Sequence, residues 1–94
     1  MVAMARALIR NPSLLLLDEP TEGLSPMVVK HLLRLLREVQ ARGTTILLIE
    51  QRLKFACSLA DRAVIMLNGR IPWDGPSVAV RDDVELQHRY LGTS

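Results

Sequence analysis

The sequence predicts an α/β fold, with parallel strands joined by crossover helices, then a β-hairpin and short C-terminal helices. Two aliphatic runs, residues 14–17 and 44–49, flank a long amphipathic helical pattern. We expect them to pair in parallel, because a helix between two strands allows a right-handed crossover. The dipeptide Asn68-Gly69 is typical of a two-residue hairpin turn. With 94 residues, the chain has room for one domain or part of one.

The first two expected elements are a helix and a strand. Residues 1–11 contain strong helix formers, and Asn11-Pro12 ends that pattern. No capping residue precedes this helix, so we expect it to be cut at its start. Residues 14–17 are four consecutive leucines between turn signals, which predicts a strand buried on both faces of a parallel sheet.

A long helix should begin at Ser25-Pro26, with serine as the N-cap and proline in the first turn. The pattern ends at Gly43. We interpret Arg34, Arg37 and Arg42 as its solvated face. Its expected apolar face comprises Val28, Leu32, Leu35, Leu36 and Val39.

The second half should contain smaller elements. The pattern predicts a short helix over residues 51–60, a strand over 63–67 and its hairpin partner over 70–73. Asp61 and Arg62 could form a local ion pair of little energetic weight. Asp74-Gly75-Pro76 should turn the chain. Residues 77–91 predict one or two helices with a break near residues 81–83. Trp73 could pack internally or face a partner.

Composition excludes several classes of protein. Hydrophobic residues make up 49% of the chain, too many for intrinsic disorder, yet the longest aliphatic runs are far too short to span a membrane. Cys57 is the only cysteine, so we expect neither a disulfide nor a metal cluster. The net charge is +2 with acids and bases interspersed, which gives no sign of nucleic-acid binding. We expect a cytoplasmic protein.

Two adjacent acids are the strongest sign of chemistry. Asp18 and Glu19 follow the leucine run, at the carboxyl end of a predicted strand, where open α/β sheets bind ligands. Mg²⁺ takes one or two carboxylates and keeps most of its waters, so one acid can hold a coordinated water while the other activates the attacking water. The alternative is a polar turn that merely ends the strand.

The segment LLLLDEPTEGLSP, residues 14–26, resembles the Walker B strand, catalytic glutamate and D-loop of ABC-type ATPases. Residues 1–12 resemble the helix after the signature sequence of that family. The resemblance implies the C-terminal part of a P-loop NTPase domain, in which Asp18 contacts Mg²⁺ through water and Glu19 is the general base for ATP hydrolysis. It also implies a D-loop that touches a second ATPase subunit, comprising Thr21, Glu22, Gly23, Leu24 and Ser25.

Gln51 stands where most ABC ATPases have a switch histidine that contacts the γ-phosphate. Its amide can donate a hydrogen bond to a phosphate oxygen but carries neither a proton for transfer nor a charge. The alternative role is a solvated residue that caps the next helix. Residues 49–71, with Glu50-Gln51, resemble the second ATP-binding subunit of branched-chain amino acid transporters, and urea or short-chain amide transporters equally well.

The resemblance covers residues 1–94 as a partial ATP-binding domain. The chain contains no GxxxxGK[ST] loop to hold the β and γ phosphates, and no signature sequence. We therefore expect negligible ATP hydrolysis by the chain alone, and open aliphatic surface that makes it prone to association.

The leading hypothesis is a truncated ATP-binding subunit of an importer, peripheral to the inner face of the membrane. Its expected cofactors are ATP and Mg²⁺, and its expected partners are a second ATPase subunit and membrane permease subunits. One alternative is a non-catalytic fragment that binds an intact ABC ATPase. A DNA-repair or translation-factor relative is the other, although residues 77–94 carry no strongly basic tail.

Overall fold

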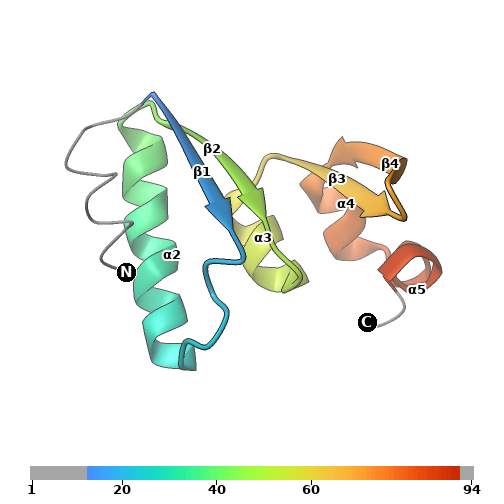
Figure 1. The fold of residues 1–94 in the computed structure, drawn as a ribbon, viewed down its shortest axis with the longest axis horizontal. Coiled ribbons are helices and arrows are strands. Elements are labelled where there is room, and N and C mark those ends of the chain that lie inside the picture. Colours follow the sequence, from blue (N-terminus) through green and yellow to red (C-terminus); the bar gives the residue numbers. More distant parts are fainter. Residues whose placement is uncertain (1–12, 92–94) are drawn as a thin grey trace. The chain divides into compact units, whose positions relative to one another are not determined.

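The computed structural model describes residues 13–91 (Figure 1). The chain forms two compact units, and the boundary lies between residues 51 and 52. The helix predicted over residues 1–11 lies outside the described part. The first unit contains β1 (Leu14–Asp18), α2 (Pro26–Ala41) and β2 (Thr45–Ile49). The second contains α3 (Leu53–Leu59), β3 (Arg62–Leu67), β4 (Arg70–Pro76), α4 (Ser77–Asp82) and α5 (Val84–Leu91).

The first unit is a β-α-β arrangement. β1 and β2 pair in parallel, with Leu14 opposite Thr45 and Asp18 opposite Ile49, which confirms the predicted crossover. Ser25 caps α2 as predicted, because its Oγ accepts a hydrogen bond of 3.3 Å from the Val28 amide. The chain leaves α2 through Gly43, whose φ of +98° suits glycine.

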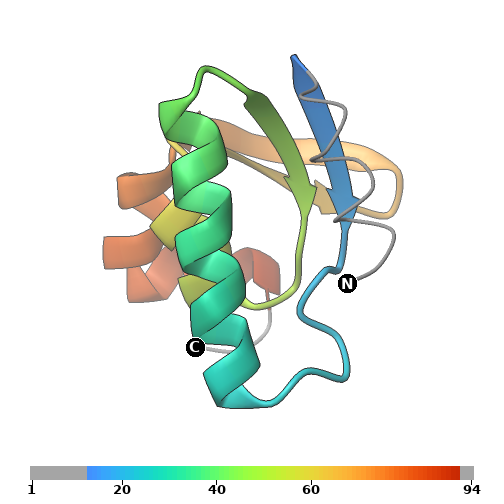
Figure 2. The same ribbon diagram turned by 90° about the vertical axis from the view of Figure 1, so that its left-hand side faces the viewer.

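The core of the first unit lies between α2 and one face of the two strands, which run alongside each other in both ribbon views (Figure 2). Leu32 and Leu36 of α2 are fully buried, and Leu15 and Leu17 of β1 are nearly so. The prediction of a first strand buried on both faces was wrong, because α2 covers only one face of the strand pair.

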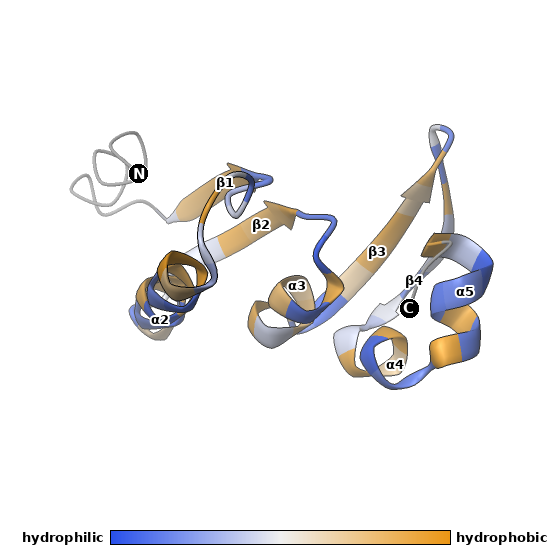
Figure 3. Cartoon of the chain, turned by 90° about the horizontal axis from the view of Figure 1, so that it is seen from below, coloured by the Kyte–Doolittle hydropathy of each residue, from blue (hydrophilic) through white to orange (hydrophobic). Residues whose placement is uncertain are grey.

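The other face of the strand pair is aliphatic and open. Its exposed fractions are 51% for Leu14, 64% for Leu16, 59% for Leu47 and 58% for Ile49. Hydrophobic colouring runs along both strands (Figure 3). The expectation of open aliphatic surface is therefore confirmed for the described residues.

The second unit is an antiparallel hairpin with three short helices. Asn68 and Gly69 both have positive φ, as a type I′ turn requires, which confirms the predicted hairpin. The prediction that Asp74-Gly75-Pro76 turns the chain was wrong. These residues extend β4, with Gly75 opposite Ala63 and Pro76 at the strand end, where its missing N–H is tolerated.

Two details of the second unit differ from expectation. The short helix begins at Leu53, not at residue 51. Arg62 pairs with Asp74 across the hairpin, its Nη2 lying 2.6 Å from Asp74 Oδ1, so its ion pair joins two strands instead of neighbours in sequence. The tail forms two helices that break at Asp83, as predicted. No helix within residues 13–91 has the length and apolar character needed to cross a lipid bilayer.

Candidate active site

The parallel pairing of β1 and β2 brings the carboxyl ends of both strands to one edge of the sheet. Asp18 is the last residue of β1 and lies opposite Ile49. The Glu19 amide donates a hydrogen bond of 2.7 Å to the carbonyl oxygen of Ile49, so the register continues one residue past β1. Asp18 and Glu19 therefore lie beside Glu50, which follows β2.

Glu19 has an unusual backbone for a glutamate. Its φ of +46° lies in the left-handed region, which non-glycine residues seldom adopt. The chain turns sharply there, and the Glu22 amide donates to the Glu19 carbonyl oxygen at 3.2 Å. Such strained backbone is often found at functional sites.

Glu19 is half-buried as a residue, and its carboxyl lies among other acids. Burial raises its pKa above the ordinary value of 4.5, and Glu22 raises it further, both by its charge and through a side-chain hydrogen bond. The charges of Asp18 and Glu50 raise the pKa as well. A raised pKa makes a carboxylate a stronger base, which suits proton abstraction from water.

A partly buried hydrogen bond joins the loops that follow the two strands. Thr21 is 1% exposed, and its Oγ1 donates a hydrogen bond of 2.7 Å to Glu50 Oε2. The other carboxylate oxygen, Glu50 Oε1, accepts from the Gln51 amide at 2.9 Å. The Glu50 carboxylate thus holds the loop after β1 and the start of the loop after β2 together.

Sequence reasoning missed this role of Glu50. The available signal was its position, because Glu50 and Glu19 both follow the last residues of paired strands. The pairing with Thr21 is a tertiary contact across 29 residues and leaves no mark in the local pattern.

The predicted D-loop continues from Thr21 to the N-cap of α2. The Thr21 side chain faces inward, whereas Glu22 and Gly23 are exposed and Leu24 is half-buried. Gly23 has a φ of +75°, and a Cβ there would have no atom within 4 Å, so glycine is needed for the turn and not for space. An exposed, tightly turned loop at this edge can reach another molecule.

Gln51 is exposed and directly follows Glu50. It does not cap α3, because the N-cap position belongs to Arg52, which makes no capping hydrogen bond with its side chain. The side chain of Gln51 is exposed to solvent, at the same edge of the sheet as Asp18 and Glu19.

The donor set suits one Mg²⁺ ion held mainly by water. Asp18 offers an exposed carboxylate. Among the described residues, no three His, Cys, Asp or Glu side chains converge to hold a metal ion directly. Mg²⁺ needs only one or two carboxylates when waters and substrate phosphates complete its shell. For the phosphates themselves, the 94-residue sequence offers no GxxxxGK[ST] loop.

Comparison with known proteins identifies the family. No protein-family model matches the chain. The branched-chain amino acid transport ATP-binding protein BraG of Pseudomonas aeruginosa is 38% identical over 92 residues, 98% of this chain. Over nearly its whole length, the chain is homologous to ABC transporter ATP-binding proteins. A second relative, the phosphonates import protein PhnC 2 of Rhodopseudomonas palustris, is 41% identical over 87 residues, which are 92% of this chain.

Solved ABC structures share the fold. An ATP-binding cassette in its ADP conformation superposes with a TM-score of 0.81 and 30% identity, covering 97% of this chain and 36% of the cassette. The cbiO1 subunit of Clostridium perfringens superposes with a TM-score of 0.77 and 34% sequence identity, covering 94% of this chain and 36% of that subunit. These likenesses confirm the ABC resemblance and the predicted fold class.

The chain spans less than half the length of these relatives. It matches 40% of the length of BraG and 31% of PhnC 2. The relatives are named for different solutes, including arginine in ArtM of Bacillus subtilis, which is 42% identical over 79% of this chain and 31% of its own length. Likeness to the family therefore does not select one solute.

Proposed function

We propose that this chain supplies the metal-binding aspartate and the general base of an ABC transporter ATPase. The phosphate-binding residues would come from sequence outside these 94 residues. The observation that carries the proposal is the placement of Asp18 and Glu19 at the carboxyl edge of the parallel strand pair, with the pKa of Glu19 raised by burial and by neighbouring acids.

Each residue at this edge has a chemical task in the proposal. Bound Mg²⁺ and ATP would supply a polarised phosphorus for attack by water. Asp18 would hold the metal through a coordinated water. Glu19 would accept the proton of the attacking water on a carboxylate oxygen. Gln51 would donate its amide N–H to a phosphate oxygen, and the Thr21–Glu50 hydrogen bond would keep the two loops in register.

The partners in this proposal follow from the exposed loop and from the family. Residues 22–25 would contact a second ATPase subunit, because they form an exposed turn beside the catalytic edge. Membrane permease subunits would hold the assembled ATPase at the cytoplasmic face of the membrane.

A chimeric ATPase tests the proposed roles. The 92 aligned residues of BraG would be replaced by those of this chain, and ATP hydrolysis measured at saturating Mg²⁺. We expect an active chimera that loses about 10²–10⁴-fold activity in Glu19→Gln, as for removal of a general base. Glu38→Gln, an exposed glutamate of α2, should leave activity unchanged.

Two results would contradict the proposal. One is a chimera whose activity does not depend on Glu19. The other is Glu19-dependent hydrolysis by the pure 94-residue chain at a rate like that of the chimera, because the chain would then hold the phosphates itself.

The proposed solute is a branched-chain amino acid. The Glu50-Gln51 pair and the likeness to BraG support it. A urea or short-chain amide importer remains the alternative solute class. Disrupting the gene for this chain in its own organism should lower uptake of labelled leucine and leave uptake of labelled urea unchanged. The reverse result would assign the alternative.

A second candidate function is binding to an intact ABC ATPase without catalysis. The open face of β1 and β2, with four aliphatic side chains more than half exposed, favours it. Stable co-purification of the chain with a full-length ATPase subunit, whose activity then falls, would support this function over the catalytic one.

A further inference from the structure

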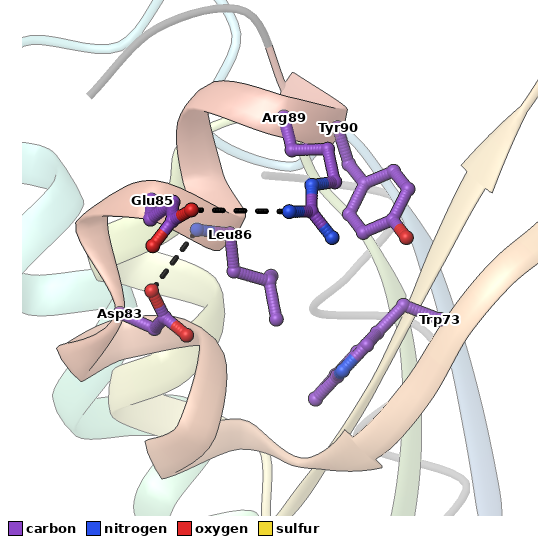
Figure 4. Close-up of a pocket in the computed structure, with 6 residues that line it drawn as sticks. All are labelled: Trp73, Asp83, Glu85, Leu86, Arg89 and Tyr90. Carbon is purple, nitrogen blue, oxygen red and sulfur yellow. Dashed lines mark hydrogen bonds and ion pairs between the residues drawn. The ribbon is translucent and has the colours of Figure 1, made fainter.

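A small pocket in the second unit takes no part in the function proposed above. It lies between β4 and α5 and has a volume of about 180 Å³ (Figure 4). Pockets for drug-sized ligands enclose about 300–1,000 Å³, so only a smaller molecule fits here. Its lining residues are Trp73, Asp83, Glu85, Leu86, Arg89 and Tyr90.

The strand side of the pocket is held in place by a close contact. The indole of Trp73 lies against Gly75, where a Cβ would come within 3.0 Å of the ring. A side chain at position 75 would push the ring away from the strand by a few tenths of an ångström. The contact positions Trp73 as a wall of the pocket and leaves the ring half-buried.

The helix side is held by hydrogen bonds. Asp83 Oδ1 accepts from the Leu86 amide at 3.0 Å and so caps the start of α5. The buried Gln87 side chain donates through Nε2 to the carbonyl oxygens of Val80, at 2.7 Å, and Arg81, at 3.0 Å. These bonds fix α5 against α4 and so hold the helix wall of the pocket in place.

The lining combines apolar surface with both signs of charge. Trp73, Leu86 and Tyr90 are half-buried and form the apolar part. Figure 4 shows the side chains of Leu86, Arg89 and Tyr90 directed to the side of α5 on which Trp73 lies. Arg89 Nη2 lies 3.8 Å from Glu85 Oε1, so the two form a loose, exposed ion pair on the rim of the pocket.

This combination favours a ligand with charges of both signs. A free anion has only Arg89 to pair with and lies near the carboxylates of Asp83 and Glu85, whereas a simple cation leaves Arg89 without a ligand contact. A small molecule with one positive group, one negative group and an apolar side chain can contact the carboxylates, the guanidinium and the apolar surface of the pocket together. We infer that the pocket binds a free α-amino acid with an apolar side chain.

In the bound complex, the ligand carboxylate lies on Arg89, the ammonium group faces Glu85 and Asp83, and the apolar side chain packs against Trp73 and Leu86. The inference rests on this pocket alone and does not depend on the ATPase proposal. The charged side chains are 65% exposed for Arg89 and 86% for Glu85, so binding should be weak, with half-saturation on the order of 1 mM.

Trp73 provides a direct readout, because it is the only tryptophan of the chain. L-leucine is titrated into the full chain while Trp73 fluorescence is recorded. We expect a saturable change, with half-saturation at least 10-fold higher in Arg89→Met and in Glu85→Gln. The matched control Arg70→Met, an exposed arginine of β4 that does not line the pocket, should bind leucine like the unmodified chain. Far-UV circular dichroism verifies that each variant is folded.

Two leucine analogues complete the test. Isocaproate lacks the amine and isoamylamine lacks the carboxylate, and each should bind at least 10-fold more weakly than leucine. Equal binding of isocaproate would make the pocket a simple anion site, and equal binding of isoamylamine a simple cation site. Either result overturns the inference, as does the absence of saturable leucine binding in both fluorescence and equilibrium dialysis.

Discussion

The two units of the chain handle charge in opposite ways. In the first unit, four carboxylates lie around one strand edge, and those of Glu22, Asp18 and Glu50 raise the pKa of Glu19. In the second unit, ion pairs join Arg62 to Asp74, Arg81 to Asp82 and Arg89 to Glu85. Like charges held together oppose folding, whereas opposite charges are at worst neutral. The cluster in the first unit therefore calls for a functional explanation, and the pairs in the second do not.

The largest expected effect comes from the core of the first unit. Leu36→Ala should lower the free energy of unfolding by about 2–5 kcal/mol, because the side chain is fully buried in α2. Urea unfolding followed by circular dichroism measures the loss. Met27→Ala on the same helix is the control, because Met27 is 70% exposed and should change stability by less than about 0.5 kcal/mol. Equal losses in both variants would mean that α2 does not pack as described.

The hydrogen bond between Thr21 and Glu50 should have the next largest effect. Thr21→Val keeps the shape but removes the donor to Glu50, which should cost about 1–3 kcal/mol of unfolding free energy. Thr45→Val, at an exposed position of β2, is the matched control and should be nearly neutral. A neutral Thr21→Val would show that this bond does not hold the two loops.

Removing the Glu19 charge should stabilise the fold modestly, and only at neutral pH. Its pKa is raised in the folded state, so ionisation disfavours folding above that pKa, and the effect vanishes below the ordinary value of 4.5. Glu19→Gln should therefore raise the melting temperature near pH 7 and lose this advantage toward about pH 4. Differential scanning fluorimetry across pH measures both. A stabilisation that grows as the pH falls would contradict the carboxylate cluster.

The smallest effect is expected for the exposed ion pair of the hairpin. Asp74→Asn should cost no more than about 1 kcal/mol, because Arg62 and Asp74 are 70% and 57% exposed. Asp61→Asn serves as the control at the neighbouring exposed acid. A loss at Asp74 larger than that of Thr21→Val would reverse the comparison between the units.

Local patterns predicted most of the fold. Ser25-Pro26 marked the start of α2, and Asn68-Gly69 marked the hairpin, because capping and turn geometry depend on residues close in sequence. The Asp74-Gly75-Pro76 segment was misjudged for the converse reason. Its glycine serves the contact with Trp73, which no local pattern reveals.

The candidate site was predictable only in part. Asp18 and Glu19 could be placed because an aliphatic strand in a parallel sheet ends at the edge where ligands bind, and the two acids follow it directly. The bond between Thr21 and Glu50 and the pocket beside Trp73 depend on residues that meet only after folding. Neither this hydrogen bond nor this pocket can be predicted from the spacing of residues along the chain.

The left-handed backbone of Glu19 affects which residues position 19 can accept. Asparagine tolerates this conformation better than glutamate, as Asn68 illustrates elsewhere in the same chain. Asparagine or glycine at position 19 would therefore lower the backbone strain and should give a more stable fold. If Glu19 is the general base proposed above, its left-handed main chain is the cost of placing a carboxylate at this turn.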